Sequence, residues 1–403
     1  MRCVKIVPIK EYIKEDFELH LCSAAFFSPI CYNWLVDGCG AIDEEVIMKP
    51  DRSTYKVLPY YPTHAAVLCN IYDCEGLPWK YCPRQQVIQA TEVLQKEHGL
   101  ELKIGFEVEF AIFNQSFEAV ELNGYSNSNS TDLYAFLLDE ICNNLELLDI
   151  EVLVIHKETG PGQYEIVLGY DSALKSLDRY FMAREAIKAV LRRNGLIGTF
   201  IPKSSSITQN GAHVHMSLWK DGKNITVDNE AKHQMGSTAN SFFASLLEAL
   251  PAFISFISPT YNGLKRLQPS VCVGSMISWG IKNKEAPLRF MPMQKNIELK
   301  TLDHTANHYY VLAAIINLGM IGINESKLLP EPLPQNPKLN AFKHLPSRWD
   351  DVLLYLESES GDLLRKAMGE EFINLNIKVR QYDIEHYFKL TLAEEIKDLT
   401  IRY

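Results

Sequence analysis

The sequence predicts an α+β protein in which helices pack on a large antiparallel sheet. Strand-like and helical patterns alternate from about residue 101 onward, and several of the strands carry polar residues on one face only. The 403 residues, 47% hydrophobic and 22% charged, have an ordinary globular composition and can bury a large core. Two domains are expected, a small one at residues 1–83 and a larger one at residues 84–403.

The expected elements follow the order of apolar runs and turn residues along the chain. Residues 65–73 (AAVLCNIYD) form an apolar run before the turn CEGLP, which predicts a strand. A helix is expected from Pro83 to His98, with Gly99 as its C-terminal stop. Further strands are expected at 101–113, 150–156, 163–168, 212–218, 275–281, 287–291 and 296–301. Further helices are expected at 131–146, 171–194, 236–257, 305–322, 348–368 and 382–398, with a low-complexity loop at 123–131.

Charge and composition exclude several classes of protein. The net charge of −10 argues against non-specific nucleic-acid binding. Because we find no run of about 18 apolar residues and no apolar core of a signal peptide, we expect no membrane span. The nine cysteines are scattered and form no CxxC pair, which favours reduced thiols in a cytoplasmic protein over a disulfide framework or a zinc site.

The segment GFEVEF (105–110) combines a buried strand with two negative charges. Phe106, Val108 and Phe110 share one face, and Glu107 and Glu109 share the other, because side chains alternate along a strand. The two carboxylates are then only about 7 Å apart. Such a pair can simply be the solvated face of a half-exposed strand, which is common in antiparallel sheets.

The same one-sided pattern recurs on three more strands, and this weakens the solvated-face interpretation. The further polar residues are Gln163 and Glu165, then His213, His215 and Ser217, then Glu298 and Lys300, with Glu158 on a loop before the first of these strands. If these faces line one cavity, the glutamates repel one another and their pKa values rise. Divalent cations relieve the repulsion, and glutamate with histidine suits Mg²⁺ or Mn²⁺.

Basic residues cluster later in the chain, in NGLKRLQP and GIKNKEAPLRF. These segments contribute Lys265, Arg266, Lys282, Lys284 and Arg289. They could be solvated loop residues, although Arg289 lies between two apolar residues of an expected strand. Metals beside converging cations are typical of phosphoryl transfer, where catalysis consists mainly of positioning and charge stabilisation. No GxxxxGK[ST] loop is present, so the chain is not a P-loop enzyme.

An ordered series of motifs between about residues 45 and 325 resembles the glutamine synthetase family. The motifs are PDRSTYKVLPYYPTHAAVLCNIYDCEGLPWKYCPR, GFEVEF, KETGPGQYEI, NGAHVHMSLW, SPTYNGLKRLQP, SWGIKNKEAPLRF and NIELKTLDHTANHYYVLAAIINLGMIGI. The residues of these motifs are more similar to the type I branch of the family and to its ligases for amines other than ammonia. The resemblance implies a glutamine synthetase-type catalytic domain with ATP at one end of a funnel, an acid substrate at the other and Mg²⁺ or Mn²⁺ between them.

The resemblance also assigns roles to individual residues. It implies one metal held by Glu109, Glu158 and Glu165, and a second metal held by Glu107, His213 and Glu298. It implies nucleotide contacts by Tyr170, His215, Ser217 and Asn296. Arg266 matches an arginine for the substrate carboxylate, Arg289 one for phosphate, and Arg266, Lys284 and Arg289 form the implied catalytic set. Gln209 and Lys300 join Arg266 as substrate-binding candidates.

Several positions depart from the family's pattern. Lysine replaces arginine at Lys284 and Lys300, which keeps the charge but loses the bidentate fork. Asn296 replaces a nucleotide-side arginine, and Cys272 falls where glutamine-forming members have a flap glutamate. Gln209 and Asn210 stand where small residues are common. The acid of the ammonium site corresponds to either Asp37 or Asp43.

These departures shape the expected function. The resemblance implies an ATP-dependent carboxylate–amine ligase that forms a γ-glutamyl or related amide through an acyl phosphate, with an amine other than ammonia. The alternative is a non-catalytic relative that keeps metal or nucleotide binding for a structural or regulatory role. The segment RCVKIVP resembles the second half of the family's opening β-hairpin, so a truncated β-grasp-like N-terminal domain is expected. The family implies a homo-oligomeric ring, possibly a dodecamer, in which that domain completes a neighbour's site.

Overall fold

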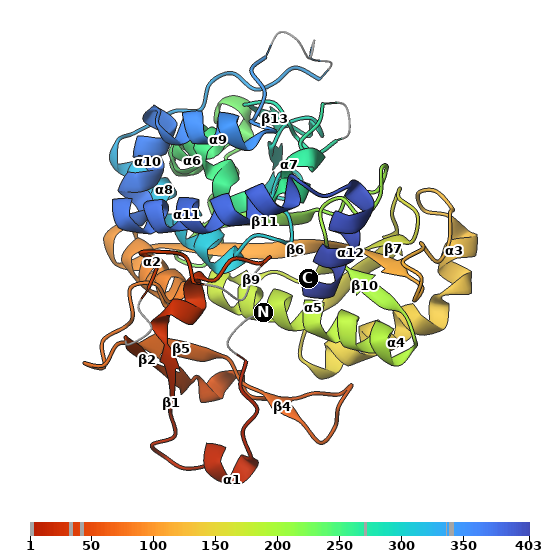
Figure 1. The fold of residues 1–403 in the computed structure, drawn as a ribbon. Helices are drawn as coiled ribbons and strands as arrows, with labels where there is room; N and C mark the ends of the chain where they lie inside the picture. Colours follow the sequence, from red (N-terminus) through yellow and green to blue (C-terminus); the bar gives the residue numbers. More distant parts are fainter. Residues whose placement is uncertain (1–3, 32–34, 41–43, 270–271, 336, 338–341) are drawn as a thin grey trace.

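The computed structural model describes residues 4–31, 35–40, 44–269, 272–335, 337 and 342–403. Its N-terminal part holds a small antiparallel sheet in the order β1-β2-β5, which lies below the large sheet in Figure 1. The bounds there are α1 (Ile9–Tyr12), β1 (Leu19–Cys22), β2 (Glu45–Pro50), β3 (Lys56–Val57), β4 (Ala65–Ala66) and β5 (Cys69–Tyr72). The strand expected at 65–73 is therefore split, because β4 pairs with β3 whereas β5 pairs with β2. The truncated β-grasp-like domain and its boundary at residue 83 stay predictions.

The large sheet organises the rest of the chain. Its main path runs in the order β13-β14-β15-β11-β6-β8-β7, and β9, β10 and β12 pair at its margins. The bounds are β6 (Leu100–Phe113), β7 (Val152–Lys157), β8 (Gln163–Leu168), β9 (Asp171–Ser172), β10 (Ile197–Thr199), β11 (Ala212–Lys220), β12 (Lys223–Asn224), β13 (Trp279–Ile281), β14 (Leu288–Met291) and β15 (Asn296–Leu299).

The expectation of an antiparallel sheet was wrong at one edge, where β13 and β14 are parallel. Their pairing covers only three residues, from Trp279↔Leu288 to Ile281↔Phe290. Such a short pair spans roughly 7 Å, so the few residues between the two strands can return the chain to its starting end. The strand expected from residue 275 begins only at Trp279.

Strand β6 has one apolar face and one face that carries the glutamates. Leu102, Ile104, Phe106, Val108 and Phe110 are almost fully buried on its apolar face. Helix α5 packs on this strand, and α2 packs on both β6 and α8. Glu107 and Glu109 therefore point to the other face of β6, away from these helices.

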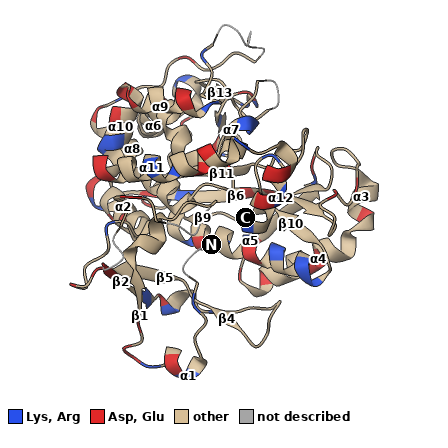
Figure 2. Cartoon of the chain, viewed as in Figure 1, with Lys and Arg blue, Asp and Glu red and all other residues tan. Residues whose placement is uncertain are grey.

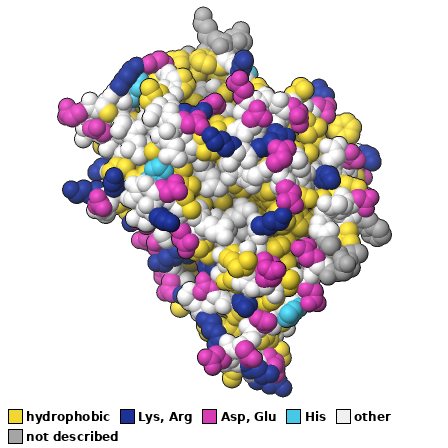
Figure 3. Space-filling model, turned by 90° about the vertical axis from the view of Figure 1, so that its left-hand side faces the viewer, with side chains coloured by type: hydrophobic (Ala, Val, Ile, Leu, Met, Phe, Trp, Pro, Cys, Tyr) yellow, Lys and Arg dark blue, Asp and Glu magenta, His cyan; other side chains and the backbone are white. Residues whose placement is uncertain are grey.

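Helices surround the sheet, which crosses the middle of Figure 1 as β6 and β11. Their bounds are α2 (Pro83–His98), α3 (Ser128–Leu133), α4 (Ala135–Leu147), α5 (Ala173–Arg193), α6 (Ser237–Ile257), α7 (Tyr261–Arg266), α8 (His308–Asn324), α9 (Trp349–Leu356), α10 (Glu359–Met368), α11 (Glu370–Tyr387) and α12 (Leu392–Arg402). Basic and acidic residues both occur on the outer helices (Figure 2), and both signs are interspersed on the face shown in Figure 3.

Two helix expectations and one loop expectation need correction. The helix expected at 348–368 is two helices, and the one expected at 382–398 is the end of α11 plus α12. Thr391 starts α12 with a reciprocal capping box to Glu394, which favours a new helix over continuation of α11. The loop expected at 123–131 ends in α3, whose N-cap is Asn127. The helix from Pro83 to His98 is confirmed, with Gly99 at φ +65° as its cap.

Helix α6 is long and apolar enough to cross a membrane by length and composition, which the sequence analysis did not expect. Its most apolar window has a mean hydropathy of 1.4, and 83% of that window is buried inside the protein. The helix packs against α8, α9 and α10. Burial against these helices accounts for its composition, as for the core helix of a large domain.

Candidate active site

The register of the sheet gathers the polar faces of four neighbouring strands. Glu107 on β6 lies opposite His213 on β11, and Glu109 lies opposite Glu165 on β8. On the other side of β11, His215 lies opposite Glu298 on β15. Residues directly opposite each other in a sheet point to the same face. The pairing therefore brings together side chains that are up to about 190 residues apart in the sequence.

The two histidines of β11 bind the carboxylates through short contacts. His213 Nδ1 lies 3.2 Å from Glu107 Oε2 and 3.6 Å from Glu298 Oε1. His215 Nε2 lies 2.9 Å from Glu107 Oε1, and its Nδ1 lies 3.0 Å from Asn296 Oδ1. Burial opposes the charge of Glu107, but the hydrogen bonds with His213 and His215 outweigh it and hold its pKa far below the usual value. Burial likewise opposes the charge of His215, yet Glu107 raises the pKa of His215 to about 9.

Three groups of side chains in the described part of the chain have the geometry to hold a metal ion. In each group, one ligand atom per residue lies within 4.8 Å of the others. The groups are Glu107 with His215 and Glu298, Glu107 with Glu165 and His213, and His156 with Glu158 and Glu165. Carboxylate oxygens with imidazole nitrogens suit Mg²⁺ or Mn²⁺. The residues present therefore fit a site for divalent metals.

The grouping differs from the two ligand sets implied by the resemblance. All six predicted residues lie on or beside the same face of the sheet, but Glu109 belongs to none of the three groups found among the described residues. His215 and His156 take part instead. The assignment of each residue to a particular metal stays a prediction.

Glu109 is held by the backbone of the neighbouring strand. Its Oε2 accepts hydrogen bonds from Gly211 N at 2.5 Å and from Gln163 Nε2 at 3.3 Å. Burial raises the pKa of Glu109 to about 7. Gly211 is needed here for space, because a Cβ on it would lie 2.3 Å from His213 Nε2 and 2.6 Å from an Arg266 nitrogen.

Two of the predicted cations converge on Glu298. Arg289 Nη1 donates to Glu298 Oε2 at 3.0 Å, and Lys300 Nζ donates to Oε1 at 3.1 Å. Burial opposes the charge of Glu298, but Lys300 and the two histidines lower its pKa to about 2. These two cations thus compensate the Glu298 carboxylate. Arg289 also keeps hydrogen-bonding capacity, because its Nε is buried without a partner among the described residues.

Arg266 is fully enclosed beneath the histidines. Its Nη atoms donate to the backbone carbonyls of Thr301 and Lys300 at 3.1 Å each, and Nη2 lies 3.3 Å from His213 Nε2. Because a guanidinium only donates, His213 Nε2 accepts in this contact, and Nδ1 carries the hydrogen that faces Glu107. A metal bound at Nδ1 would move that hydrogen to Nε2 and would require the contact with Arg266 to open. Burial lowers the pKa of Arg266 from its usual value. This arginine therefore orients His213 as well as supplying charge.

Two of the predicted nucleotide residues, Ser217 and Tyr170, contact a tryptophan that the sequence did not single out. Trp219 Nε1 donates to Ser217 Oγ at 2.9 Å. The Tyr170 ring stacks on Trp219 with centroids 6.4 Å apart, and Lys103 Nζ lies 4.4 Å from the Trp219 centroid. Alternation along β11 places Trp219 on the face of Ser217, His215 and His213, a signal that was available in the sequence.

Other predicted residues are placed at the margin of the site or outside the described residues. Lys284 and Cys272 are exposed, and Cys272 has a positive φ of 57°. Gln209 is half-buried, and its Oε1 has no hydrogen-bond partner among the described residues. Asp37 is exposed, whereas Asp43 lies outside the described residues, so the choice between them stays open.

A buried ion pair behind the loop of Glu158 was also missed. Lys157, which is fully buried, donates to the carbonyls of Glu158 at 2.5 Å and Gly160 at 2.6 Å. Its Nζ also lies 3.4 Å from Glu121 Oε1. Lys157 lies next to a predicted ligand, but nothing local to the sequence predicts that its charge is buried or that Glu121, 36 positions earlier, is its partner.

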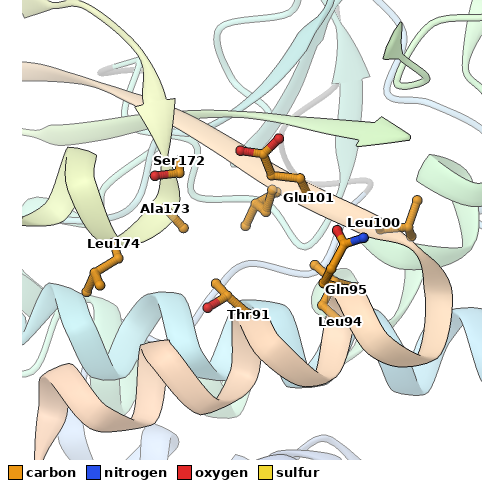
Figure 4. Close-up of a pocket in the computed structure, with 9 residues that line it drawn as sticks. Thr91, Leu94, Gln95, Leu100, Glu101, Ser172, Ala173 and Leu174 are labelled. Atoms are coloured by element: carbon orange, nitrogen blue, oxygen red, sulfur yellow. The ribbon is translucent and has the colours of Figure 1, made fainter. Parts of the chain in front are cut away.

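A small cavity lies apart from this constellation. Thr91 and Gln95 of α2, Leu102 of β6 and Leu174 of α5 are among its lining residues (Figure 4). Its volume of about 140 Å³ is small for a nucleotide, since ligand pockets run to roughly 300–1,000 Å³. None of the predicted site residues lines it.

Comparison with known proteins agrees with this geometry. The family model of the glutamine synthetase catalytic domain matches residues 80–399, which is most of the chain. The chain belongs to the glutamine synthetase family. Members of this family use ATP and divalent metals, and the fold predicted from the resemblance is confirmed.

Curated glutamine synthetases align along most of their own length. The type-1 glutamine synthetase 1 of Dictyostelium discoideum is 30% identical over 366 residues, covering 83% of this chain and 73% of the relative. The glutamine synthetase of Pyrococcus abyssi is 32% identical over 380 residues, covering 90% and 84%.

Solved structures with lower identity share the fold of this glutamine synthetase family member. A novel glutamine synthase homolog has a TM-score of 0.83 at 20% identity, covering 96% of this chain and 91% of the other. GmaS without ligand has a TM-score of 0.79 at 24% identity, covering 88% and 85%.

Proposed function

We propose that the protein is an ATP-dependent ligase that joins the side-chain carboxylate of glutamate, or of a related acid, to a primary amine other than ammonia. The observation that carries the proposal is the convergence of three possible metal groups with Arg266, Arg289 and Lys300 on one face of the sheet. Family membership supports ATP as the second substrate, and GmaS, a protein of the same fold, has been solved with ADP.

In the proposed reaction, a carboxylate oxygen of the acid attacks the γ-phosphorus of ATP, and ADP leaves with the former bridging oxygen. The amine nitrogen then attacks the acyl carbon, inorganic phosphate leaves, and the nitrogen loses a proton. Bound divalent metal would neutralise charge on the phosphate oxygens. Arg289 and Lys300 are placed to donate to anionic oxygens, and Arg266 holds His213 in its orientation.

Two departures from the family's pattern argue against ordinary glutamine formation. Lys300 weakens the grip on the acid substrate, because it gives a point charge where a guanidinium would make two parallel bonds to a carboxylate. The preference for a larger amine rests on Cys272. Cys272 is exposed, and a neutral thiol attracts an ammonium ion less well than a carboxylate does. An amine that is delivered neutral depends less on such an anionic group.

We extend the proposal to cellular setting and assembly. Seven cysteines of the described residues, namely Cys31, Cys39, Cys69, Cys74, Cys82, Cys142 and Cys272, have free thiols, which is compatible with the cytoplasm. Glutamine synthetases are generally oligomeric, and we propose a homo-oligomeric ring for this chain too. Light scattering of the purified protein would test the assembly, and a monomer at micromolar concentration would contradict it.

The test of activity is ADP release by the full chain with ATP and Mn²⁺ or Mg²⁺. Glutamate and related diacids are crossed with ammonium, methylamine, ethylamine and longer primary amines, and a reaction without acid gives the ATPase background. Amine-dependent turnover that exceeds the ammonium rate supports the proposal. Efficient glutamine formation, near the typical ~10 per second of enzymes, contradicts the amine preference. No ADP release with any pair would favour the non-catalytic alternative, in which the metal and nucleotide sites serve a structural or regulatory role.

A further inference from the structure

The His156 imidazole faces the carboxylate of Glu165, and the contact between them requires a proton or a metal ion. Its Nδ1 lies 3.2 Å from the backbone carbonyl of Lys157, and a carbonyl can only accept a hydrogen bond, so Nδ1 carries a hydrogen. The other ring nitrogen, Nε2, lies 3.1 Å from Glu165 Oε1. In the neutral imidazole this nitrogen is a lone-pair acceptor. Two acceptors at this distance repel unless a proton or a metal ion lies between them.

Histidines that bind a metal through one ring nitrogen usually donate a hydrogen bond from the other, often to a backbone carbonyl, as His156 Nδ1 does here. Such a bond fixes the tautomer and directs the free nitrogen toward the metal. Metal–nitrogen and metal–oxygen bonds of about 2.1 Å place neighbouring ligand atoms of an octahedral ion roughly 3.0 Å apart. The observed separation of 3.1 Å matches that spacing.

Glu158 completes the group from the loop that follows β7. Ligand atoms of His156, Glu158 and Glu165 lie within 4.8 Å of one another. Glu158 Oε2 accepts hydrogen bonds from Thr159 N at 2.9 Å and from its hydroxyl at 3.3 Å, which orients the carboxylate. The Tyr125 ring packs edge-on against His156, with centroids 5.7 Å apart, and restricts the imidazole from its outer side.

A β-bulge in β7 places His156, and not Ile155, opposite Glu165. The register of β7 and β8 shifts between Val152 and Val154, and after the shift His156 pairs with Glu165. Without the extra residue, Ile155 would lie opposite Glu165, and His156 would point to the other face. The bulge thus places an imidazole where continuous pairing would place an isoleucine.

We propose that His156 is a ligand of the metal held by Glu158 and Glu165, and that its nitrogen makes this position select Mn²⁺ over Mg²⁺. A carboxylate site with one imidazole can hold either ion, but the nitrogen favours manganese, because manganese belongs to the first-row metals that bind mixed nitrogen and oxygen ligands, whereas magnesium demands near-ideal octahedral coordination by oxygen and keeps its waters. The inference rests on the metal requirement of the proposed ligase. Metal binding can nevertheless be measured without turnover.

The experiment measures binding of Mn²⁺ and of Mg²⁺ to the full chain by titration calorimetry, without ATP. We expect His156→Gln to weaken Mn²⁺ binding at one site by at least about tenfold, since even loss of an outer-sphere partner costs roughly 10–100-fold. Mg²⁺ affinity should change much less. His156→Asp, which offers oxygen in place of nitrogen, should lower the ratio of Mn²⁺ to Mg²⁺ affinity while keeping the site.

His20→Gln is the matched control, because His20 also lies between two glutamates, 3.5 Å from Glu18 and 3.4 Å from Glu45, but in the N-terminal sheet. It should leave both affinities unchanged. Pulsed electron paramagnetic resonance of bound Mn²⁺ gives a second readout. A ¹⁴N coupling should remain in the double variant His213→Gln/His215→Gln. It should disappear when His156→Gln is added to that variant.

The outcomes separate this inference from the proposed function. Equal losses of Mn²⁺ and Mg²⁺ affinity in His156→Gln, or a ¹⁴N coupling that survives all three substitutions, would overturn the assignment of His156 alone. A wild-type chain that binds neither metal would overturn the metal-dependent ligase as well. Selective Mn²⁺ loss in a chain without ligase turnover would support the metal site and reject the function.

Discussion

Replacing Lys157 by methionine tests whether the buried ion pair with Glu121 positions the metal-binding loop. Lys157 is fully buried and Glu121 is 8% exposed, so both charges are shielded from water. Glu121 also accepts hydrogen bonds from Asn123 N at 2.7 Å, Ser130 Oγ at 2.8 Å and Gly162 N at 2.9 Å. The pair therefore joins the start and the end of the Glu158 loop to the segment before α3.

The magnitude follows from what the substitution leaves behind. Lys157→Met removes the donor to the carbonyls of Glu158 and Gly160 and leaves the Glu121 carboxylate buried without a countercharge. Breaking a buried ion pair from one side costs about 3–5 kcal/mol, which is a large part of a typical unfolding free energy of about 5–15 kcal/mol. We expect the lower end, because three neutral donors still bind Glu121.

The assay is denaturant unfolding of a double-mutant cycle with Glu121→Gln. The double variant should recover about 1.5 kcal/mol or more relative to the sum of the single variants, because it buries no unpaired charge. Lys175→Met is the control, since Lys175 is 58% exposed in its 2.8 Å pair with Asp171 and such surface pairs contribute about 0–1 kcal/mol.

Mn²⁺ affinity provides the second readout of the same variants. It should fall in Lys157→Met, because the backbone of Glu158 loses its anchor, and should recover in part in the double variant. A cost below about 1 kcal/mol for Lys157→Met, or strict additivity in the cycle, would refute the reasoning that this pair is a coupled, desolvated unit.

Three further predictions concern the site itself. Millimolar Mn²⁺ should raise the melting temperature, since a ligand that binds only the native state adds about 2.7 kcal/mol at a hundredfold excess over its dissociation constant; a shift that persists undiminished in Glu107→Ala would contradict the site. ATP should bind with metal but not in the presence of a chelator, because its phosphates would otherwise meet Glu107 and Glu165; calorimetry showing equal affinities would argue against that geometry. Cys272→Glu should raise ammonium-dependent turnover relative to that with primary amines, whereas Cys74→Glu, at another exposed cysteine, should not; identical ratios in both variants would exclude a role for position 272 in choosing the amine.

The sequence by itself determined those features that depend on local periodicity. Alternation along GFEVEF separated Glu107 and Glu109 from the apolar face of β6, and that face is buried as expected. Proline at the start and glycine at the end bounded α2 at Pro83 and His98. The ordered motifs predicted the family, which the comparisons confirm. The strand and helix signals each lie within a few residues of what they predict, whereas the family follows from the order of the motifs along the chain.

Only the tertiary structure decided which side chains share a site and which ones were overlooked. The strand order β15-β11-β6-β8 and its register select the partners of each glutamate, and no local pattern encodes a register between distant strands. His156 became a candidate ligand through a single extra residue in β7, because a shift of one residue turns every following side chain to the other face. Lys157 drew no prediction from the sequence, because the burial of a charge depends on what packs around it in the fold, here Glu121, and not on its neighbours in sequence.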